Sequence, residues 1–319
     1  MAFDAIRQCF FIPKPTFTEK ELPDQNGRVF IVTGGYTGVG LELSKILYSK
    51  NGTVYLAGRS PEKGDKAIST IKQAHPSSDG RVEFLKLDLA DLPSIKASAE
   101  DFLKREQRLD VLTNNAGVMT PPVGSKTAQN YELQLGTNIL GPFLFTKFLT
   151  PLLERTASTS PAGAVRVTWA ASLATMFSPS GGVTFDAKND VVTHDNKFKD
   201  YGQTKAGNVL LSREFQARIG DKAGIVSNAW NPGNLLSELQ RHQSAIEAFL
   251  TKRLVYPPKL GGYTELYAGF SEEAGRKENK GKYIGPWGRF VQLRSDIEKN
   301  AEGARKLWEW CDKETKPYQ

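Results

Sequence analysis

The stretch RVFIVTGGYTGVG, residues 28–40, joins a short apolar run to a cluster of glycines. The run RVFIVT (28–33) is uninterrupted and rich in β-branched residues, which predicts a strand buried on both faces. The glycines let the backbone turn tightly before the helix pattern VGLELSKILYSK. A helix that begins directly after such a turn presents free N–H groups, which can bind a pyrophosphate. This stretch therefore predicts the first strand–turn–helix unit of a nucleotide-binding α/β fold.

The same alternation continues along the chain. Further strands are predicted at 53–58, 81–88, 109–114, 164–172 and 225–232, with helix patterns between them, and GKYIGPWGRFVQL near the C-terminus predicts a last strand. Buried strands separated by helices are typical of a parallel sheet covered on both faces. We expect one doubly wound Rossmann α/β domain over residues 27–319, with a mostly parallel seven-stranded sheet and a C-terminal helix.

Three segments interrupt this alternation. Residues 1–26 form a proline-containing N-terminal extension, 173–199 predict a long loop, and 234–258 interrupt the sixth crossover. Loops of this length in a compact domain are commonly functional. We expect residues 234–258 to form a lid over the substrate.

Composition narrows the class of protein. Of the 319 residues, 39% are hydrophobic and 24% are charged, and the net charge of +7 is spread along the chain, so we expect no nucleic-acid partner. Two cysteines, Cys9 and Cys311, make no disulfide framework, and the three histidines lack metal-ligand spacing. The N-terminus has no signal-peptide pattern, and the apolar stretch 139–153 contains Lys147 and two prolines. We expect a cytoplasmic protein without a bound metal or integral membrane contact, with loose membrane association as an alternative.

Two positions bear on the choice of nucleotide. The turn has the spacing G-x-x-x-G-x-G, and we expect its residues to hold the diphosphate: Thr33, Gly34, Tyr36, Thr37, Gly38, Val39 and Gly40. At the end of the second strand, NAD sites carry an acid that bonds the ribose 2′-hydroxyl, whereas this chain has Gly58 followed by Arg59 and Ser60. A guanidinium suits a 2′-phosphate, so we expect NADP rather than NAD. The alternative is that Arg59 is an ordinary surface arginine.

The stretch YGQTK (201–205) places a tyrosine four residues before a lysine. Alone it is weak evidence, because one such pair is expected by chance in a lysine-rich chain. Further motifs precede and follow it in order: LDL ending at Leu89, NNAG (114–117), TNILG with Asn138, AAS ending at Ser172, and NPGNLLSEL (231–239). Together with the glycine turn, this pattern resembles the short-chain dehydrogenase/reductase family, most closely its retinol-dehydrogenase-like and WW-domain-oxidoreductase-like members. The resemblance covers about residues 27–240.

The resemblance implies roles for individual residues. Asp88 would bond the adenine ring beside Leu89, and the family's motif after strand four would line the adenosine side with Asn115, Ala116 and Gly117. The segment that touches the nicotinamide amide would contain Pro232, Gly233, Leu235 and Ser237. Asn138, Tyr201 and Lys205 would also contact the cofactor. Two departures stand out: Ala171 replaces a serine, and Asn231 occupies a position that is often histidine in close relatives.

The chemistry of the tyrosine–lysine pair agrees with this assignment. Hydride transfer to or from a carbonyl carbon needs a proton partner at the oxygen, and Tyr201 can act as that acid or base. Lys205, one helical turn on, would lower the pKa of Tyr201, and by resemblance it would bind the nicotinamide ribose. Ser172 would hydrogen-bond the substrate oxygen. Asn138 would hold a water in a proton relay, and the alternative is that it only supports its helix.

The substrate is the least defined part of the prediction. Met119, Met176, Phe177, Phe249 and Tyr256 suggest an apolar pocket for a lipophilic ketone, aldehyde or alcohol, although ordinary packing explains them equally well. By resemblance, helices 131–154 and 201–219 would pair in a homodimer or homotetramer. Two other functions stay open. The fold could perform imine reduction, dehydration or epimerisation in specialised biosynthesis, or it could serve as a non-catalytic NADP-binding sensor or scaffold.

Overall fold

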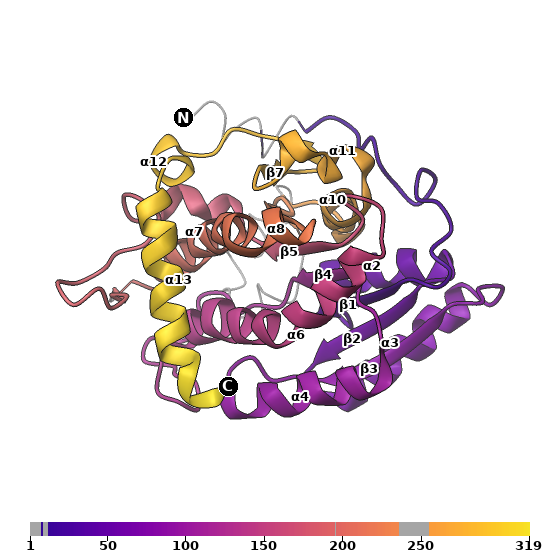
Figure 1. The fold of residues 1–319 in the computed structure, drawn as a ribbon, viewed down its shortest axis with the longest axis horizontal. Helices are drawn as coiled ribbons and strands as arrows, with labels where there is room; N and C mark the ends of the chain where they lie inside the picture. The colour runs from indigo at the N-terminus through magenta and orange to yellow at the C-terminus, as the bar shows by residue number, and fades with distance from the viewer. Residues whose placement is uncertain (1–7, 9–11, 195, 236–254) are drawn as a thin grey trace.

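Eight strands form one sheet in the order β3-β2-β1-β4-β5-β6-β7-β8 in the computed structural model, which describes residues 8, 12–194, 196–235 and 255–319 (Figure 1). The strands are β1 Val29–Thr33, β2 Thr53–Gly58, β3 Arg81–Lys86, β4 Val111–Asn114, β5 Arg166–Ala170, β6 Val226–Trp230, β7 Tyr283–Gly285 and β8 Arg289–Phe290. All neighbours run parallel except β7 and β8. The strand order reverses between β1 and β4, and a crevice opens at such a reversal in doubly wound sheets.

The predicted fold class is confirmed, but the predicted number of seven strands is wrong. The stretch expected to form one last strand contains both β7 and β8, which pair antiparallel. Between them lie Pro286, Trp287 and Gly288, and Gly288, with φ of +87°, donates its N–H to the Gly285 oxygen at 3.0 Å. A turn built on a positive φ and a proline therefore splits the segment.

Helices cover both faces of the sheet. On one face lie α4 Leu92–Arg105, α6 Gly141–Ser158 and α7 Lys197–Phe215, and on the other lie α2 Gly38–Ser49, α3 Pro61–Ala74 and α10 Pro258–Phe270. Shorter elements are α5 Leu133–Leu135, η1 Gly136–Leu140, η2 Leu173–Phe177, η3 Gln216–Gly220, α8 Asp221–Ala223, α11 Glu272–Gly275, η5 Lys277–Asn279, α12 Ser295–Glu298 and η6 Lys316–Tyr318. The yellow helix α13, Ala301–Thr315, packs across α7 and α6 (Figure 1). It therefore covers part of the surface that the sequence analysis assigned to subunit pairing.

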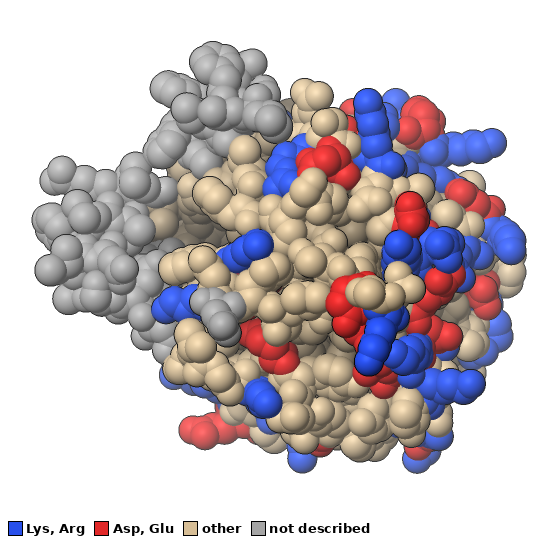
Figure 2. Space-filling view, turned by 90° about the vertical axis from the view of Figure 1, so that its left-hand side faces the viewer, with Lys and Arg blue, Asp and Glu red and all other residues tan. Residues whose placement is uncertain are grey.

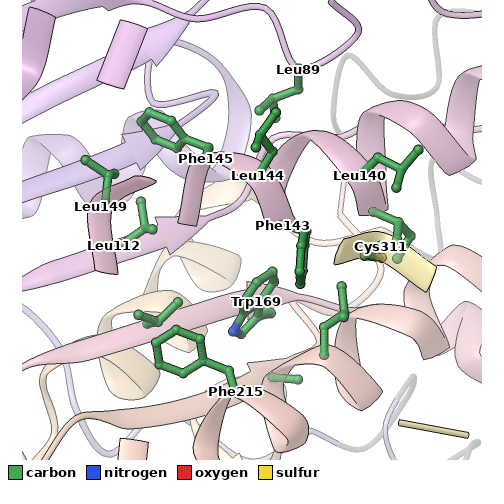
Figure 3. Close-up of a cluster of buried hydrophobic side chains, with 14 of the residues drawn as sticks. Leu89, Leu112, Leu140, Phe143, Leu144, Phe145, Leu149, Trp169, Phe215 and Cys311 are labelled. Atoms are coloured by element: carbon green, nitrogen blue, oxygen red, sulfur yellow. The ribbon is translucent and has the colours of Figure 1, made fainter. Parts of the chain in front are cut away.

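The core beneath α6 and α7 is aromatic and closely packed. Trp169 of β5 lies next to Phe143 of α6 and Phe215 of α7 (Figure 3), and all three side chains are buried. The indole nitrogen of Trp169 donates to Ser227 Oγ at 3.1 Å, so its polar atom is satisfied. Burying an aromatic side chain of this size contributes about 1.5–3 kcal/mol each. This core fixes β5, and Ser172, described below, follows the end of that strand.

Two helix boundaries differ from the sequence prediction for local reasons. Helix 131–154 is interrupted, because residues 136–140 form a π-helical turn between α5 and α6. Helix α7 begins four residues earlier than its predicted start at Tyr201, because Asn196 caps it and accepts from Phe198 N and Lys199 N, both at 3.1 Å. Within the predicted loop 173–199, the structure also contains the 3₁₀ turn η2.

The N-terminal segment from residue 12 runs along the outside of α10. Leu22 is buried, Glu19 pairs with Lys259 at 3.0 Å, and Arg289 donates to the Pro13 oxygen at 2.7 Å. Most of the predicted lid, residues 236–254, lies outside the described residues, so the lid stays a prediction. Among the described helices, none combines the length and apolar character needed to cross a bilayer.

Charged side chains of both signs are interspersed on the surface. On the face drawn in Figure 2, acidic and basic groups lie beside one another. Elsewhere in the described chain, ion pairs such as Arg305–Glu309 and Arg218–Glu214 join side chains of opposite charge. Exposed pairs of this kind add little stability. They do account for much of the charged composition without a functional role.

Glu265 on α10 is an exception to this surface placement of charge. It is fully buried, and neither carboxylate oxygen has a hydrogen-bond partner among the described residues. The hydroxyl of the adjacent Thr264 also lacks one there. Burial raises the pKa of Glu265 well above its usual value, so the side chain is held as a neutral acid.

Replacement of Glu265 by Gln should make stability less dependent on pH. The unfolded wild-type chain loses a proton from Glu265 above pH about 4.5, whereas the folded chain keeps it, so stability falls as pH rises toward the folded pKa. Urea unfolding at pH 5 to 8 should show the advantage of Glu265→Gln growing by up to about 1.4 kcal/mol per pH unit in that window. The exposed Glu272→Gln should give no such trend, and a pH-independent difference for Glu265→Gln would contradict the assignment.

Candidate active site

A cleft of about 650 Å³ opens at the carboxyl ends of the strands. Its lining includes most of the residues that the sequence analysis selected: Gly34, Tyr36, Thr37, Gly38, Val39, Arg59, Ser60, Asp88, Leu89, Asn115, Ala116, Gly117, Ser172, Tyr201, Lys205, Pro232, Gly233 and Leu235. Thr33, Gly40 and Asn138 lie behind this lining, and Ser237 lies outside the described residues. Residues far apart in the sequence thus meet at one edge of the sheet.

The glycine-rich turn is tied to the end of β4. Thr33 Oγ1 accepts from the N–H groups of Asn115 and Ala116 at 3.0 and 2.9 Å, and Asn115 Nδ2 donates to the Thr33 oxygen at 2.8 Å. A Cβ on Gly40 would lie 2.6 Å from Asn115 Nδ2, so a side chain there would break this connection. These contacts explain why the chain has Thr33, Gly40 and Asn115 at these three positions.

The N-terminus of α2 is suited to an anion. Thr37 at the N-cap makes no side-chain hydrogen bond to the helix, so the first N–H groups of α2 stay available. Gly38 has φ of +55°, and no atom lies within 4 Å of its would-be Cβ. Thr37, Gly38 and Val39 all line the cleft. Free N–H groups, a positive helix end and no blocking side chain fit a diphosphate.

Gly58 at the end of β2 is needed for packing. Its would-be Cβ would lie 2.1 Å from Cε1 of Tyr36, whose hydroxyl accepts from Arg59 N at 3.2 Å. The Tyr36 ring also packs against Phe84, with 6.2 Å between ring centroids. An acid at position 58 would therefore displace Tyr36, which gives a steric reason for the missing carboxylate.

The first turn of α3 adds a residue that the sequence analysis missed. Ser60 caps α3 and accepts from Lys63 N at 3.3 Å, and Lys63 lines the cleft near Arg59. The spacing R-S-P-E-K was the available signal, because the first turn of a helix that follows Arg59 must pass the same edge of the cleft. Arg59 itself is exposed and can reach a ligand without desolvation.

Asp88 and Leu89 form another part of the cleft wall. Asp88 Oδ1 accepts from Ala90 N at 2.9 Å, which leaves the second carboxylate oxygen for a ligand. The would-be Cβ of Gly141 on α6 would lie 2.4 Å from the Leu89 oxygen, so α6 packs directly behind this wall. The geometry is consistent with the adenine contact that the resemblance implied.

Ser172, Tyr201 and Lys205 meet at the end of β5. Ser172 directly follows Ala171 at this strand end, and its side chain lines the cleft together with the Tyr201 phenol. Lys205 Nζ donates to the Ala170 oxygen at 3.0 Å and lies 5.6 Å from the centroid of the Tyr201 ring. Tyr201 is 8% exposed and Lys205 is 4% exposed. The structure therefore brings together the three residues predicted to carry the chemistry.

Burial shifts both ionisable groups toward their neutral forms. It raises the pKa of Tyr201 to about 12, against the smaller opposing effect of the nearby Ser172 hydroxyl, and it lowers the pKa of Lys205 to about 8. The sequence analysis expected Lys205 to lower the tyrosine pKa. In the structure, desolvation has a larger effect on the pKa of Tyr201 than the charge of Lys205 does.

Asn138 lies at 0% exposure within the π-helical turn. Its Oδ1 accepts from Val118 N at 2.8 Å, and its Nδ2 donates to the Val118 oxygen at 2.9 Å and to Thr204 Oγ1 at 3.1 Å. The side chain thus holds the loop after β4 against α7. This geometry favours the supporting role named as an alternative, and the water relay stays a prediction.

Asn208 is a second residue that the sequence analysis missed. It follows Lys205 by three positions on α7, and its Nδ2 donates to the same Ala170 oxygen at 2.9 Å. Its Oδ1 is buried without a partner among the described residues. The i,i+3 spacing from Lys205 was the available signal, since it puts both side chains on one helix face.

The reaction end of the cleft is mainly apolar. Val118, Met119 and Trp230 line it together with Pro232 and Leu235. Of the other predicted lining residues, Phe177 is 70% exposed, Tyr256 packs against Trp287 at 5.0 Å, and Phe249 lies outside the described residues. The described residues contain no cluster of three or more His, Cys, Asp or Glu that could hold a metal.

Known proteins resemble this chain in sequence and in fold. A family model described as short chain dehydrogenase matches residues 28–181. A short-chain dehydrogenase/reductase of Phomopsis amygdali is 47% identical over 99% of both chains, and one of Emericella nidulans, pkfC, is 44% identical over 95% of this chain and 97% of its own. Among solved structures, a Pseudomonas aeruginosa RhlG/NADP complex superposes with a TM-score of 0.63 at 22% identity, covering 82% of this chain and 95% of that one. At that identity the likeness shows the fold alone.

Replacement of Gly58 by Ala tests the packing at the end of β2. The new methyl group would overlap Tyr36, so Gly58→Ala should destabilise the protein by about 1–3 kcal/mol in urea unfolding. In a Tyr36→Ala background the same change should cost much less, because the overlapping ring is gone. Gly269→Ala is a matched control, since its would-be Cβ meets only Val111 Cγ1 at 3.4 Å. Equal costs in both backgrounds would contradict the steric explanation.

Proposed function

The chain belongs to the short-chain dehydrogenase/reductase family, a family of oxidoreductases that bind NAD(P), and from this premise we propose an NADP(H)-dependent enzyme that interconverts a lipophilic ketone or aldehyde and the corresponding alcohol. The observation that supports this proposal most is the meeting of Ser172, Tyr201 and Lys205 on one wall of a cleft. The diphosphate-suited turn at Gly34–Gly40 opens onto the same cleft.

The residues divide the chemistry at the substrate oxygen. When bound, the nicotinamide supplies the hydride to the carbonyl carbon in reduction or accepts it in oxidation. Tyr201 donates its phenolic proton to the oxygen in reduction, and Ser172 Oγ donates a hydrogen bond to the same oxygen as negative charge develops. A pKa near 12 keeps Tyr201 protonated at neutral pH, which supports this acid role.

Oxidation requires the opposite state of Tyr201. The phenol must then accept a proton from the alcohol, which it can do only as phenolate. A positive charge on Lys205, 5.6 Å from the ring, favours that form. Asn138 supports the loop after β4 through Val118, and its predicted part in cofactor binding and in a proton relay is the less supported element of this proposal.

The preference for NADP rests on the end of β2. Gly58 provides no carboxylate for a 2′-hydroxyl, while Arg59, Ser60 and Lys63 line the same part of the cleft. Cationic groups there suit a 2′-phosphate, because its oxygens accept charge-assisted hydrogen bonds. Pro232, Gly233, Leu235 and Ser237 remain the proposed nicotinamide segment. A homodimer or homotetramer and a cytoplasmic location remain proposals too.

Tyr201→Phe is the decisive variant. Removal of the phenolic hydroxyl should lower the rate of NADPH-dependent carbonyl reduction by about 10²–10⁴-fold, because the proton donor is gone. The dissociation constant for NADPH, measured by fluorescence titration, should stay near the wild-type value. Tyr131→Phe is the matched control, since that hydroxyl donates to Glu314 at 2.6 Å outside the cleft. Undiminished turnover in Tyr201→Phe would refute the proposed function.

A panel of lipophilic ketones, aldehydes and alcohols separates the alternatives. Tight NADPH binding without turnover of any panel member would favour the sensor or scaffold. Oxidation of NADPH in the presence of an imine would favour imine reduction. Product formation without net oxidation or reduction of the nucleotide would favour dehydration or epimerisation.

Arg59→Ala tests the nucleotide preference. Loss of a charge-assisted hydrogen bond costs about 1.5–3 kcal/mol, so the KM for NADPH should rise by about 10–100-fold. The KM for NADH should change little, because NADH has no 2′-phosphate. Arg105→Ala, at an exposed site on α4, serves as the control for lost surface charge. An equal rise in the KM values for NADPH and NADH would show that Arg59 does not bind the 2′-phosphate.

A further inference from the structure

Hydrogen bonds from β7 and from the loop after β5 hold the backbone of Ser172. Its carbonyl oxygen accepts from Thr175 N at 3.1 Å and from the Tyr283 hydroxyl at 3.0 Å, so both lone pairs are used. Its Oγ accepts from Ala174 N at 3.1 Å. Tyr283 is the first residue of β7 and is 7% exposed. The position of Ser172 therefore depends on a hydroxyl from a strand more than a hundred residues later in the chain.

Arg294 holds the loop that follows Ser172. Its Nη1 donates to the oxygens of Met176 at 3.1 Å and Ser178 at 2.8 Å, and its Nη2 donates to the Pro179 oxygen at 2.9 Å. Asp296 pairs with Arg294 at 2.5 Å and accepts from Gly181 N at 2.8 Å. We call Tyr283, Arg294 and Asp296 the C-terminal clamp.

The held loop lies directly against the helix that carries the tyrosine. A Cβ on Gly202, the residue after Tyr201, would lie 2.7 Å from the Ala174 oxygen and 3.0 Å from Ser178 N. The loop is thus confined between the C-terminal clamp on one side and the turn of α7 with Tyr201 on the other. Because Ser172 begins this loop and Tyr201 lies beside it, we expect a displacement of the loop to change the distance between Ser172 and the phenol.

The clamp residues lie outside the part of the chain that the family model matches, which ends at residue 181. We propose that Tyr283 and Arg294 are positioning residues, which act through Ser172 to keep its hydroxyl aligned with Tyr201 and the substrate oxygen. Tyr283 fixes the carbonyl of Ser172, and Arg294 fixes the backbone of the loop that would otherwise pull Ser172 away. This inference rests on the proposed function.

Tyr283→Phe removes only the hydroxyl and tests the first half of the proposal. With NADPH and 4-nitrobenzaldehyde as a reporter carbonyl, kcat should fall about three- to tenfold, as expected for one lost hydrogen bond, while the KM for NADPH stays unchanged. In a Ser172→Ala background the same change should have no further effect, because the residue it positions no longer has a hydroxyl. Additive losses in the double variant, or an unchanged kcat in Tyr283→Phe alone, would overturn the proposal.

Hydrogen exchange tests the clamp without any substrate. In the full chain bound to NADPH, Arg294→Met should speed exchange of the amides of Ala174, Thr175 and Ser178, and Arg294→Lys should restore part of the protection. Arg305→Met, an exposed arginine on α13, is the matched control. Unchanged exchange in Arg294→Met would remove Arg294 from the proposal.

The outcomes separate this inference from the function on which it rests. If Tyr201→Phe loses reporter turnover but Tyr283→Phe does not, the clamp fails and the proposed function stands. If Tyr201→Phe retains turnover, the proposed function fails whatever the clamp variants do. If the reporter is not reduced, the exchange experiment still decides whether the clamp holds the loop.

Discussion

The cleft depends on the connection between the ends of β1 and β4. Thr33 accepts two backbone N–H groups from the chain after β4, and Asn115 returns a hydrogen bond to the Thr33 oxygen. These bonds fix the turn at the point where the strand order reverses, which is where a doubly wound sheet can receive a ligand. Without them, Gly34 and Gly38 would have only the flexibility of glycine, which favours the unfolded chain. With them, the same glycines form a fixed surface on which a diphosphate can lie.

At the other end of the cleft, burial sets the chemistry. Tyr201 and Lys205 are both taken out of water, and each is pushed toward its neutral form. Lys205 is oriented by the Ala170 oxygen, which it shares with Asn208, so its direction is set by the backbone at the end of β5. A neutral phenol and a weakly held lysine proton leave the pair responsive to any further charge in the cleft. In the proposed function, this responsiveness would let Tyr201 serve as acid in one direction and as base in the other.

The sequence predicted the features that are local. The glycine turn, the six strands up to β6 and the tyrosine–lysine spacing each depend on a few neighbouring residues, and the strand order with its helices confirms the Rossmann fold. What it missed has two kinds of cause, one local and one that depends on distant neighbours. Lys63 matters because α3 passes Arg59, the split of the last strand follows from the turn at Gly288, and Tyr283 meets Ser172 across 111 positions of sequence. Lys63 and the turn at Gly288 left local signals that the prediction overlooked, whereas Tyr283 carries no spacing signal, because only the folded sheet brings it to Ser172.

The way the C-terminal clamp recognises its loop has a consequence for specificity. Arg294 and Tyr283 bind carbonyl oxygens between Ser172 and Pro179, and Arg294 also binds Ser178 Oγ at 3.2 Å, so most of these bonds do not depend on the side chains of the loop. Met176 and Phe177 can therefore be exchanged without loss of the hydrogen bonds that fix Ser172. If the proposed clamp holds Ser172, the side chains of this loop can vary while the Ser172 hydroxyl stays in place. In the proposed function, selectivity would then rest on side chains and catalysis on the backbone path that the clamp holds.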